Sequence, residues 1–416
     1  MKIIDMHCDT ISELADRGGE LWKNSGHLDL KRMQESGYLL QNFALFVDIG
    51  KCTPTPWERV CALYEVYRTE LEKNKNRIVP VLCYEDILKN EAGGKLSALL
   101  TVEEGAVCGG SLERLRELYD MGVRMLTLTW NYRNELGWPA TRRCLGQSRG
   151  DVDGRPTEKS VQEKIPGTGR SSCAGENPTT AIETEKGETG IRGSDGRDAA
   201  CGLTETGRNF VTEMERLGMI PDVSHLSDAG FDDVWECTKK PFVASHSNAR
   251  AVCPSLRNLT DDQIRRLAER GGCMGLNYYD KFLVDGGSKD PEVLWEALIR
   301  QARHITDVGG MEILGLGSDF DGIPINPALP GAEAMPVLWA MPTHSTWKSL
   351  AAVSVLGGIG FTVSLFIANL SFGNMGPEGI ELLEHAKLGI VMGSLVSGIL
   401  GYILLNLFLP KQQEVE

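Results

Sequence analysis

The chain has 416 residues, of which 24% are charged and 42% hydrophobic, and this composition is typical of a globular protein of one to three domains. Its formal net charge of −14 argues against a nucleic-acid partner, because no basic patch dominates the sequence. The cysteines are scattered without a Cys-x-x-Cys pair and no apolar signal segment follows Lys2, so reduced thiols in the cytosol fit better than a disulfide framework.

Short apolar, β-branched runs alternate with amphipathic stretches over residues 1–339. The expected strands are 2–9, 38–49, 95–104, 123–131, 219–226, 241–248, 273–280 and 312–320. The expected helices between them include 56–75, 111–122, 203–218, 227–240 and 260–272, and several begin at Ser or Thr and end in Gly. This alternation predicts an α/β fold, a closed parallel (β/α)8 barrel of the TIM type, with a doubly wound open sheet as the alternative.

Residues 140–200 interrupt this alternation. They contain no aromatic residue and few branched aliphatic ones, so they predict a solvated, disordered insertion between the fourth strand and the helix before the fifth.

The sequence changes character after "DFDGIP" at 319–324. Residues 349–373 and 388–410 are uncharged and apolar, and each exceeds the ~20 residues needed to cross ~30 Å of hydrocarbon. They predict a two-helix transmembrane hairpin within residues 340–416, with two buried core helices as the alternative. The flanking Lys348 and Lys411 predict that both ends face the cytoplasm, which would place the protein in the inner (cytoplasmic) membrane with its catalytic domain on the cytoplasmic side.

Polar residues end several of the expected strands, where a (β/α)8 barrel builds its active site. They are His7, Asp9, Glu104, His225, His246 and Asp319. Strand alternation puts His7 and Asp9 on one side, and a carboxylate such as Glu104 can bridge two cations with its two oxygens. Together they form a mixed nitrogen and oxygen ligand set that suits Zn²⁺ or a similar divalent ion.

Each residue alone has a simpler interpretation. A single histidine at a strand end is more often a hydrogen-bonded structural residue than a ligand, and Glu103 and Glu104 could form a solvated strand end. Asp319 and Asp321 in "SDFDG" could make only a turn. The joint placement at successive strand ends favours the metal site.

The motifs "DMHCDT", "VEEGAV", "RMLTLTWN", "PDVSHLS", "FVASHSNARAVCPSLRNLTDDQI" and "LGSDFDG" resemble the membrane dipeptidase (renal dipeptidase) family over residues 1–339, apart from the insertion. The resemblance implies a (β/α)8 barrel that holds two zinc ions and hydrolyses dipeptides with a metal-bridging hydroxide. It implies that His7 and Asp9 bind one zinc, that His225 and His246 bind the other, and that Glu104 bridges them and serves catalysis.

The same resemblance assigns three further roles. Asp319 matches the catalytic acid/base, Arg257 the residue that binds the substrate carboxylate, and Tyr279 a residue of the substrate pocket. Trp130 stands where the renal enzymes place a substrate-contacting histidine. Past "DFDG" only "PGAEAMPVLW" is recognisable, so the barrel is expected to be truncated at its C-terminal end.

Residues 340–410 resemble the last two transmembrane helices of the NhaA-type Na⁺/H⁺ antiporter family, with "GGIGFTVSLFIA" as the most specific match. The chain therefore resembles a fusion joined near residues 339–340. Neither apolar segment contains Asp or Glu, so no acidic residue is available there to carry Na⁺ or H⁺.

These patterns predict a zinc-dependent dipeptidase whose partners are a dipeptide substrate, the lipid bilayer and, as an open question, a second copy of the chain. The alternatives are an antiporter-related membrane fragment, an inactive chimera, or another amidohydrolase reaction. Amidohydrolase barrels of the last kind more often carry His-x-His on the first strand and a modified lysine as the bridge.

Overall fold

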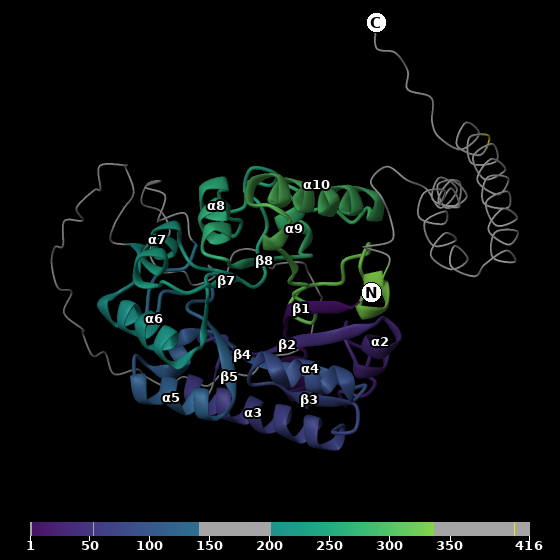
Figure 1. The fold of residues 1–416 in the computed structure, drawn as a ribbon, viewed down its shortest axis with the longest axis horizontal. Coiled ribbons are helices and arrows are strands. Elements are labelled where there is room, and N and C mark those ends of the chain that lie inside the picture. Colours follow the sequence, from purple (N-terminus) through teal and green to yellow (C-terminus); the bar gives the residue numbers. More distant parts are fainter. Residues whose placement is uncertain (1, 53, 141–200, 337–402, 404–416) are drawn as a thin grey trace, which may run out of the picture. The chain divides into compact units, whose positions relative to one another are not determined.

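The computed structural model describes residues 2–52, 54–140, 201–336 and 403, and the chain divides after Met335 into two compact units (Figure 1). Every element named below belongs to the first unit. Apart from Ala140 and Ile403, the predicted insertion and the two predicted spans lie outside the described residues. Among the residues that are described, no helix is both long and apolar enough to cross a bilayer.

Parallel strands form a closed barrel at the centre of this unit (Figure 1). Their order is β2-β1-β9-β8-β7-β6-β5-β4-β3, and β2 also pairs with β4, which closes a ring of eight strands and leaves β3 outside it. The bounds are β1 Ile3–Cys8, β2 Tyr38–Phe46, β3 Ile78–Pro80, β4 Leu96–Glu103, β5 Val123–Thr127, β6 Ile220–Asp222, β7 Val243–Ala244, β8 Cys273–Leu276 and β9 Leu314–Leu316. The predicted closed barrel is confirmed, and the open-sheet alternative is wrong.

Helices surround this ring (Figure 1). They are α1 Thr10–Arg17, α2 Leu30–Glu35, α3 Pro56–Lys73, α4 Tyr84–Ala92, α5 Leu112–Asp120, α6 Glu205–Leu217, α7 Asp228–Cys237, α8 Asp261–Glu269, α9 Asp280–Leu283 and α10 Pro291–Gly309. The five predicted helices correspond to α3, α5, α6, α7 and α8. Each begins after a Ser or Thr whose hydroxyl accepts a hydrogen bond from a backbone N–H of the first turn, as the sequence predicts.

The alternation of β4 shows how the sequence divides between the two faces of the barrel wall. Leu96, Ala98, Leu100 and Val102 form one apolar, buried row. The other row contains Ser97, Leu99, Thr101 and, at the end of the strand, Glu103, and it carries every polar residue of the strand. Because successive side chains point to opposite faces, Glu103 belongs to the polar row and the apolar row packs in the core.

The strand ends β7, β8 and β9 approach one another closely at Ser245. A Cβ atom on either Gly275 or Gly317 would overlap the carbonyl oxygen of Ser245, so both positions need glycine. This close approach brings Ser245 and its neighbour His246 toward the barrel axis.

Candidate metal centre

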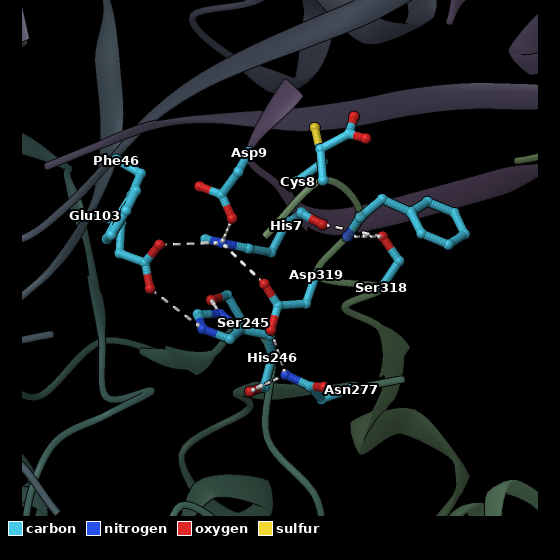
Figure 2. A network of polar contacts seen from close by, with 12 residues as sticks. His7, Cys8, Asp9, Phe46, Glu103, Ser245, His246, Asn277, Ser318 and Asp319 are labelled. Carbon is cyan, nitrogen blue, oxygen red and sulfur yellow. Dashed lines mark hydrogen bonds and ion pairs between the residues drawn. The ribbon is translucent and has the colours of Figure 1, made fainter. Parts of the chain in front are cut away.

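Side chains from five strand ends meet at the carboxyl-terminal face of the barrel, and Figure 2 shows four of them, His7, Glu103, His246 and Asp319. His7 comes from β1, Glu103 from the end of β4, and Asp319 from the loop after β9. His225 and His246 follow β6 and β7. His7, Glu103 and His246 are almost completely buried, so this is an ionisable cluster held away from solvent.

The carboxylate of Glu103 lies at the centre of the cluster. Its Oε1 lies 3.0 Å from Nε2 of His225 and 3.4 Å from Nε2 of His246, and the two Nε2 atoms lie 3.0 Å apart. Its Oε2 lies 3.3 Å from Nε2 of His7 (Figure 2). Each Glu103 oxygen therefore belongs to a different group of ligand atoms.

The second group is built around His7. Its Nε2 lies 3.4 Å from Oδ2 of Asp9 and 4.0 Å from Oδ1 of Asp319 (Figure 2). Within the described residues, Nε2 of His7 and Oδ1 of Asp9 are buried and make no hydrogen bond. Buried polar atoms rarely stay unsatisfied, which indicates that this group has a ligand to bind.

Glu104, predicted as the bridge, lies outside the cluster, and Glu103 occupies the central position expected of the bridge. Oε1 of Glu104 accepts hydrogen bonds from the backbone N–H of Ala106 at 2.8 Å and from Nδ2 of Asn134 at 2.5 Å. Its Oε2 accepts one from the backbone N–H of Trp130 at 3.2 Å. Glu104 lies directly after β4, where a φ of 113° takes the backbone out of the extended conformation, so its side chain turns away from the polar row that ends at Glu103. Strand alternation in "LSALLTVE" could have identified Glu103 from the sequence.

The outer nitrogens of two histidines are held by oxygen atoms. Nδ1 of His225 lies 3.1 Å from Oδ1 of Asn131, and Nδ1 of His246 lies 2.7 Å from Oγ of Ser245. An amide oxygen can only accept, so Nδ1 of His225 carries the proton and its Nε2 presents a lone pair to Glu103. Acceptor atoms that converge in this way need a cation between them.

A metal ion fits this arrangement. Ligands about 2.1 Å from one tetrahedral ion lie about 3.4 Å from each other. The ligand atoms of His225, His246 and Glu103 lie 3.0, 3.0 and 3.4 Å apart, at or slightly inside that edge. Burial, with the charge of nearby Arg257, lowers the pKa of His225 to about 4, and burial, with His7, lowers the pKa of His246 to about 3. Both imidazoles are therefore neutral at pH 7, as metal ligation requires.

Asp319 stands at the edge of the cluster with a different environment. Its Oδ2 accepts a hydrogen bond from Nδ2 of Asn277 at 3.0 Å, and its side chain keeps a small exposure of 13% (Figure 2). Burial, reinforced by the carboxylates of Asp9 and Glu103, raises the pKa of Asp319 to about 7. A carboxyl group with this pKa can both accept and donate a proton near neutral pH.

The predicted substrate residues lie around the cluster in two places. The guanidinium of Arg257 lies 3.4 Å from Oγ of Ser247 and from the carbonyl oxygen of His246, and it packs 5.3 Å from the ring of Phe282. Tyr279 packs edge-on against the same Phe282. Burial lowers the pKa of Arg257 to about 10, so its charge is kept at neutral pH.

Trp130 lies on the other side, beside His225. Its ring centroid lies 6.3 Å from that of His225 and 4.9 Å from that of Phe46, which it meets edge-on. Trp130 therefore lies next to the cluster, where its ring and that of Phe46 form an aromatic surface beside His225.

Four residues other than glycine have a positive φ among the described residues, and all four lie at this face. They are Glu104 at 113°, His225 at 69°, Asp319 at 62° and Asp321 at 67°. Asp321 is no ligand, because its carboxylate accepts hydrogen bonds from the Thr10 hydroxyl at 2.6 Å and the His27 N–H at 2.6 Å.

Comparison with known proteins finds two families. The family model "Membrane dipeptidase (Peptidase family M19)" matches residues 1–151 and 179–358, so 152–178 of the predicted insertion falls outside it. The model "Na+/H+ antiporter 1" matches residues 334–405, and both resemblances expected from the sequence are confirmed.

Individual relatives also match this chain, and one of them is named a dipeptidase. An uncharacterized dipeptidase of Schizosaccharomyces pombe is 29% identical over 73% of this chain and 62% of its own length. An uncharacterized protein from the pqqA 5′ region of Klebsiella pneumoniae is 36% identical over 36% of this chain and 56% of its own length. The chain thus matches less than two thirds of either relative.

A solved structure extends the agreement to the fold. The metallo peptidase of Rhodobacter sphaeroides, liganded with a phosphinate mimic of the dipeptide L-Ala-D-Ala, is 25% identical. The match covers 84% of this chain and 95% of that one, with a TM-score of 0.63. Matched over most of its length by the family model, and carrying a buried cluster suited to a metal cofactor, the chain belongs to the membrane dipeptidase family, peptidase family M19.

Proposed function

We propose that this protein is a zinc-dependent dipeptidase with two metal ions per barrel. The observation that supports it most is the division of the Glu103 carboxylate between two ligand groups, His225 with His246 and His7 with Asp9. Two zinc ions held this way would supply Lewis acidity to a scissile carbonyl and lower the pKa of a water molecule.

The protein residues divide the remaining work. Asp319, next to the His7 group and with its pKa near 7, takes a proton from the attacking water and returns it to the departing amine. Arg257 stays charged and offers a planar fork that suits a carboxylate, so it would fix the C-terminal end of a dipeptide. Trp130 and Phe46 would keep water from one side of the site.

The experiment is a dipeptidase assay on the full chain before and after metal removal. We expect activity on dipeptides that a chelator abolishes and that added Zn²⁺ restores, with close to two equivalents of zinc per chain in the active protein. Folded protein that binds zinc without cleaving any dipeptide would contradict the proposed reaction. Folded protein with well under one equivalent would contradict the metal centre.

Replacing Arg257 with Ala is expected to raise KM for dipeptides by about 10- to 100-fold, since a hydrogen bond to a charged group contributes about 1.5–3 kcal/mol. Arg257→Lys is the matched control, because it keeps the charge but loses the fork, and it should recover only part of the affinity. Steady-state kinetics of both variants measure this. A fall in kcat at unchanged KM would show that Arg257 acts on the reacting carbonyl instead.

For the C-terminal segment, we propose that residues 349–373 and 388–410 hold the enzyme at the cytoplasmic face of the inner membrane, without Na⁺/H⁺ exchange. The support is the match of 334–405 to an antiporter family and the lack of acidic residues in both segments. We expect the full chain in the membrane fraction, and a Glu378→Cys variant to react with an impermeant thiol reagent from outside. Recovery in the soluble fraction, or sodium-dependent proton flux in vesicles, would contradict the proposal. The homodimer stays a prediction.

A further inference from the structure

A buried carboxylate lies directly beneath the His246 ligand. Asp222, at the end of β6, is fully buried. Its Oδ1 accepts hydrogen bonds from the backbone N–H groups of Ser224 at 3.0 Å and Ser245 at 2.9 Å. Its Oδ2 accepts them from the hydroxyls of Ser245 at 2.5 Å and Thr127 at 2.7 Å. Four donors converge on this group, so it is held as a carboxylate.

The proton count at Ser245 fixes the direction of the next hydrogen bond. A serine hydroxyl has a single proton, and the ionised Asp222 at 2.5 Å is its strongest acceptor. Oγ of Ser245 must then accept from Nδ1–H of His246, 2.7 Å away. Nε2 of His246 is left with its lone pair, which faces Glu103 and His225.

We propose that Asp222 and Ser245 are positioning residues that preset His246 in the tautomer able to bind a metal through Nε2. Outer partners of this kind fix the ring orientation and tautomer of metal-binding histidines. The effect on zinc binding rests on the proposed function, because it requires the metal centre proposed above. The tautomer of His246 is a property of the metal-free protein and can be measured without zinc.

A second serine–aspartate pair in the barrel, Ser318 with Asp5, has the same pair of hydrogen bonds and provides a matched control. Ser318, after β9, donates its backbone N–H to Oδ1 of Asp5 at 2.9 Å and its hydroxyl to Oδ2 at 2.6 Å. The hydroxyl of Ser318 also lies 3.1 Å from the carbonyl oxygen of His7 and accepts from the N–H of Phe320 at 3.2 Å (Figure 2). Among the hydrogen bonds of the described residues, Ser318 has none to an imidazole nitrogen. Ser318→Ala therefore removes the same serine–aspartate hydrogen bond without touching a ligand ring.

The test compares Ser245→Ala with Ser318→Ala in the full chain. Zinc affinity is measured by competition with a chromophoric chelator, and thermal stability is measured on metal-free protein. We expect both variants to lose similar stability, whereas only Ser245→Ala weakens binding of one zinc ion, by about 10- to 100-fold. Equal affinity in wild type and Ser245→Ala, or an equal loss in both variants, would overturn the proposal.

Imidazole ¹⁵N shifts of the metal-free protein give a readout that stability does not affect. With seven histidines in the chain, the His246 signals can be assigned from a His246→Asn variant. We expect Nδ1–H in the wild type. Asp222→Asn should place an amide donor against Ser245, turn the hydroxyl proton toward His246 and favour Nε2–H. An Nε2–H wild type, or an unchanged tautomer in folded Asp222→Asn, would overturn the proposal. If the wild type binds no zinc, the proposed function fails, but the ¹⁵N shifts still decide this inference.

Discussion

Replacing Glu103 with Gln is expected to abolish dipeptidase activity and to reduce zinc content from about two equivalents to about one per chain. The amide presents one acceptor oxygen where the carboxylate presents two, so it can serve only one of the two ligand groups. Losing this charge removes several kcal/mol of metal-supplied stabilisation, which corresponds to about 10³-fold or more in rate. Metal analysis and steady-state kinetics on the folded variant measure the two effects.

The matched control is the neighbouring residue. Glu104→Gln keeps the size of the side chain and can still accept from Ala106 and Asn134, so we expect it to retain zinc and most of the activity, within about tenfold. The opposite result, metal loss in Glu104→Gln and retention in Glu103→Gln, would show that the bridge lies one residue further along the chain.

Replacing Asp319 with Asn is expected to lower kcat by about 10²–10⁴-fold while both zinc ions stay bound. A general acid/base typically contributes this much, and the amide cannot carry the proton. Oδ1 of Asp319 lies 4.0 Å from Nε2 of His7, further away than Oδ2 of Asp9 at 3.4 Å, so Asp319 contributes less to the ligand group. Zinc loss that matches the rate loss would make Asp319 a ligand instead of a proton carrier.

The eight ring strands could be predicted because each is a short apolar run between polar segments, and a parallel barrel buries both faces of its strands. The predicted ends were less accurate. Segments 219–226 and 241–248 shrink to β6 and β7, and part of the reason is that Ser224 and Ser245 donate their backbone N–H groups to the Asp222 carboxylate instead of to a neighbouring strand. Such side-chain bonds join distant parts of the sequence and leave no periodic pattern.

Among the other elements that were not predicted are α10 and β3, and the sequence carries a signal for only one of these two. α10 begins at Pro291 after Asp290, whose side chain accepts from the first turn, and its apolar residues recur at helical spacing. β3 is only three residues long and lies outside the ring, so no strand pattern marks it.

At the site, residue types and their order along the chain brought together His7, Asp9, His225, His246 and Asp319, which meet as expected. The choice between Glu103 and Glu104 depended on where β4 ends and on the face that Glu103 occupies, and strand alternation places Glu103 in the polar row. The support from Asn131, Ser245 and Asn277 depends on loop conformation, which spacing in the sequence does not encode.

Glu104, His225, Asp319 and Asp321 have a positive φ, which lowers thermal stability at positions in or beside the proposed site. Each such residue costs about 1–2 kcal/mol that glycine would not incur, and two of the four, His225 and Asp319, are residues of the proposed site. If variants were selected for thermal stability alone, we would therefore expect glycine or asparagine to replace residues at these positions. The most heat-resistant variants would then have lost the site, so laboratory evolution of this barrel needs a screen for turnover alongside one for survival.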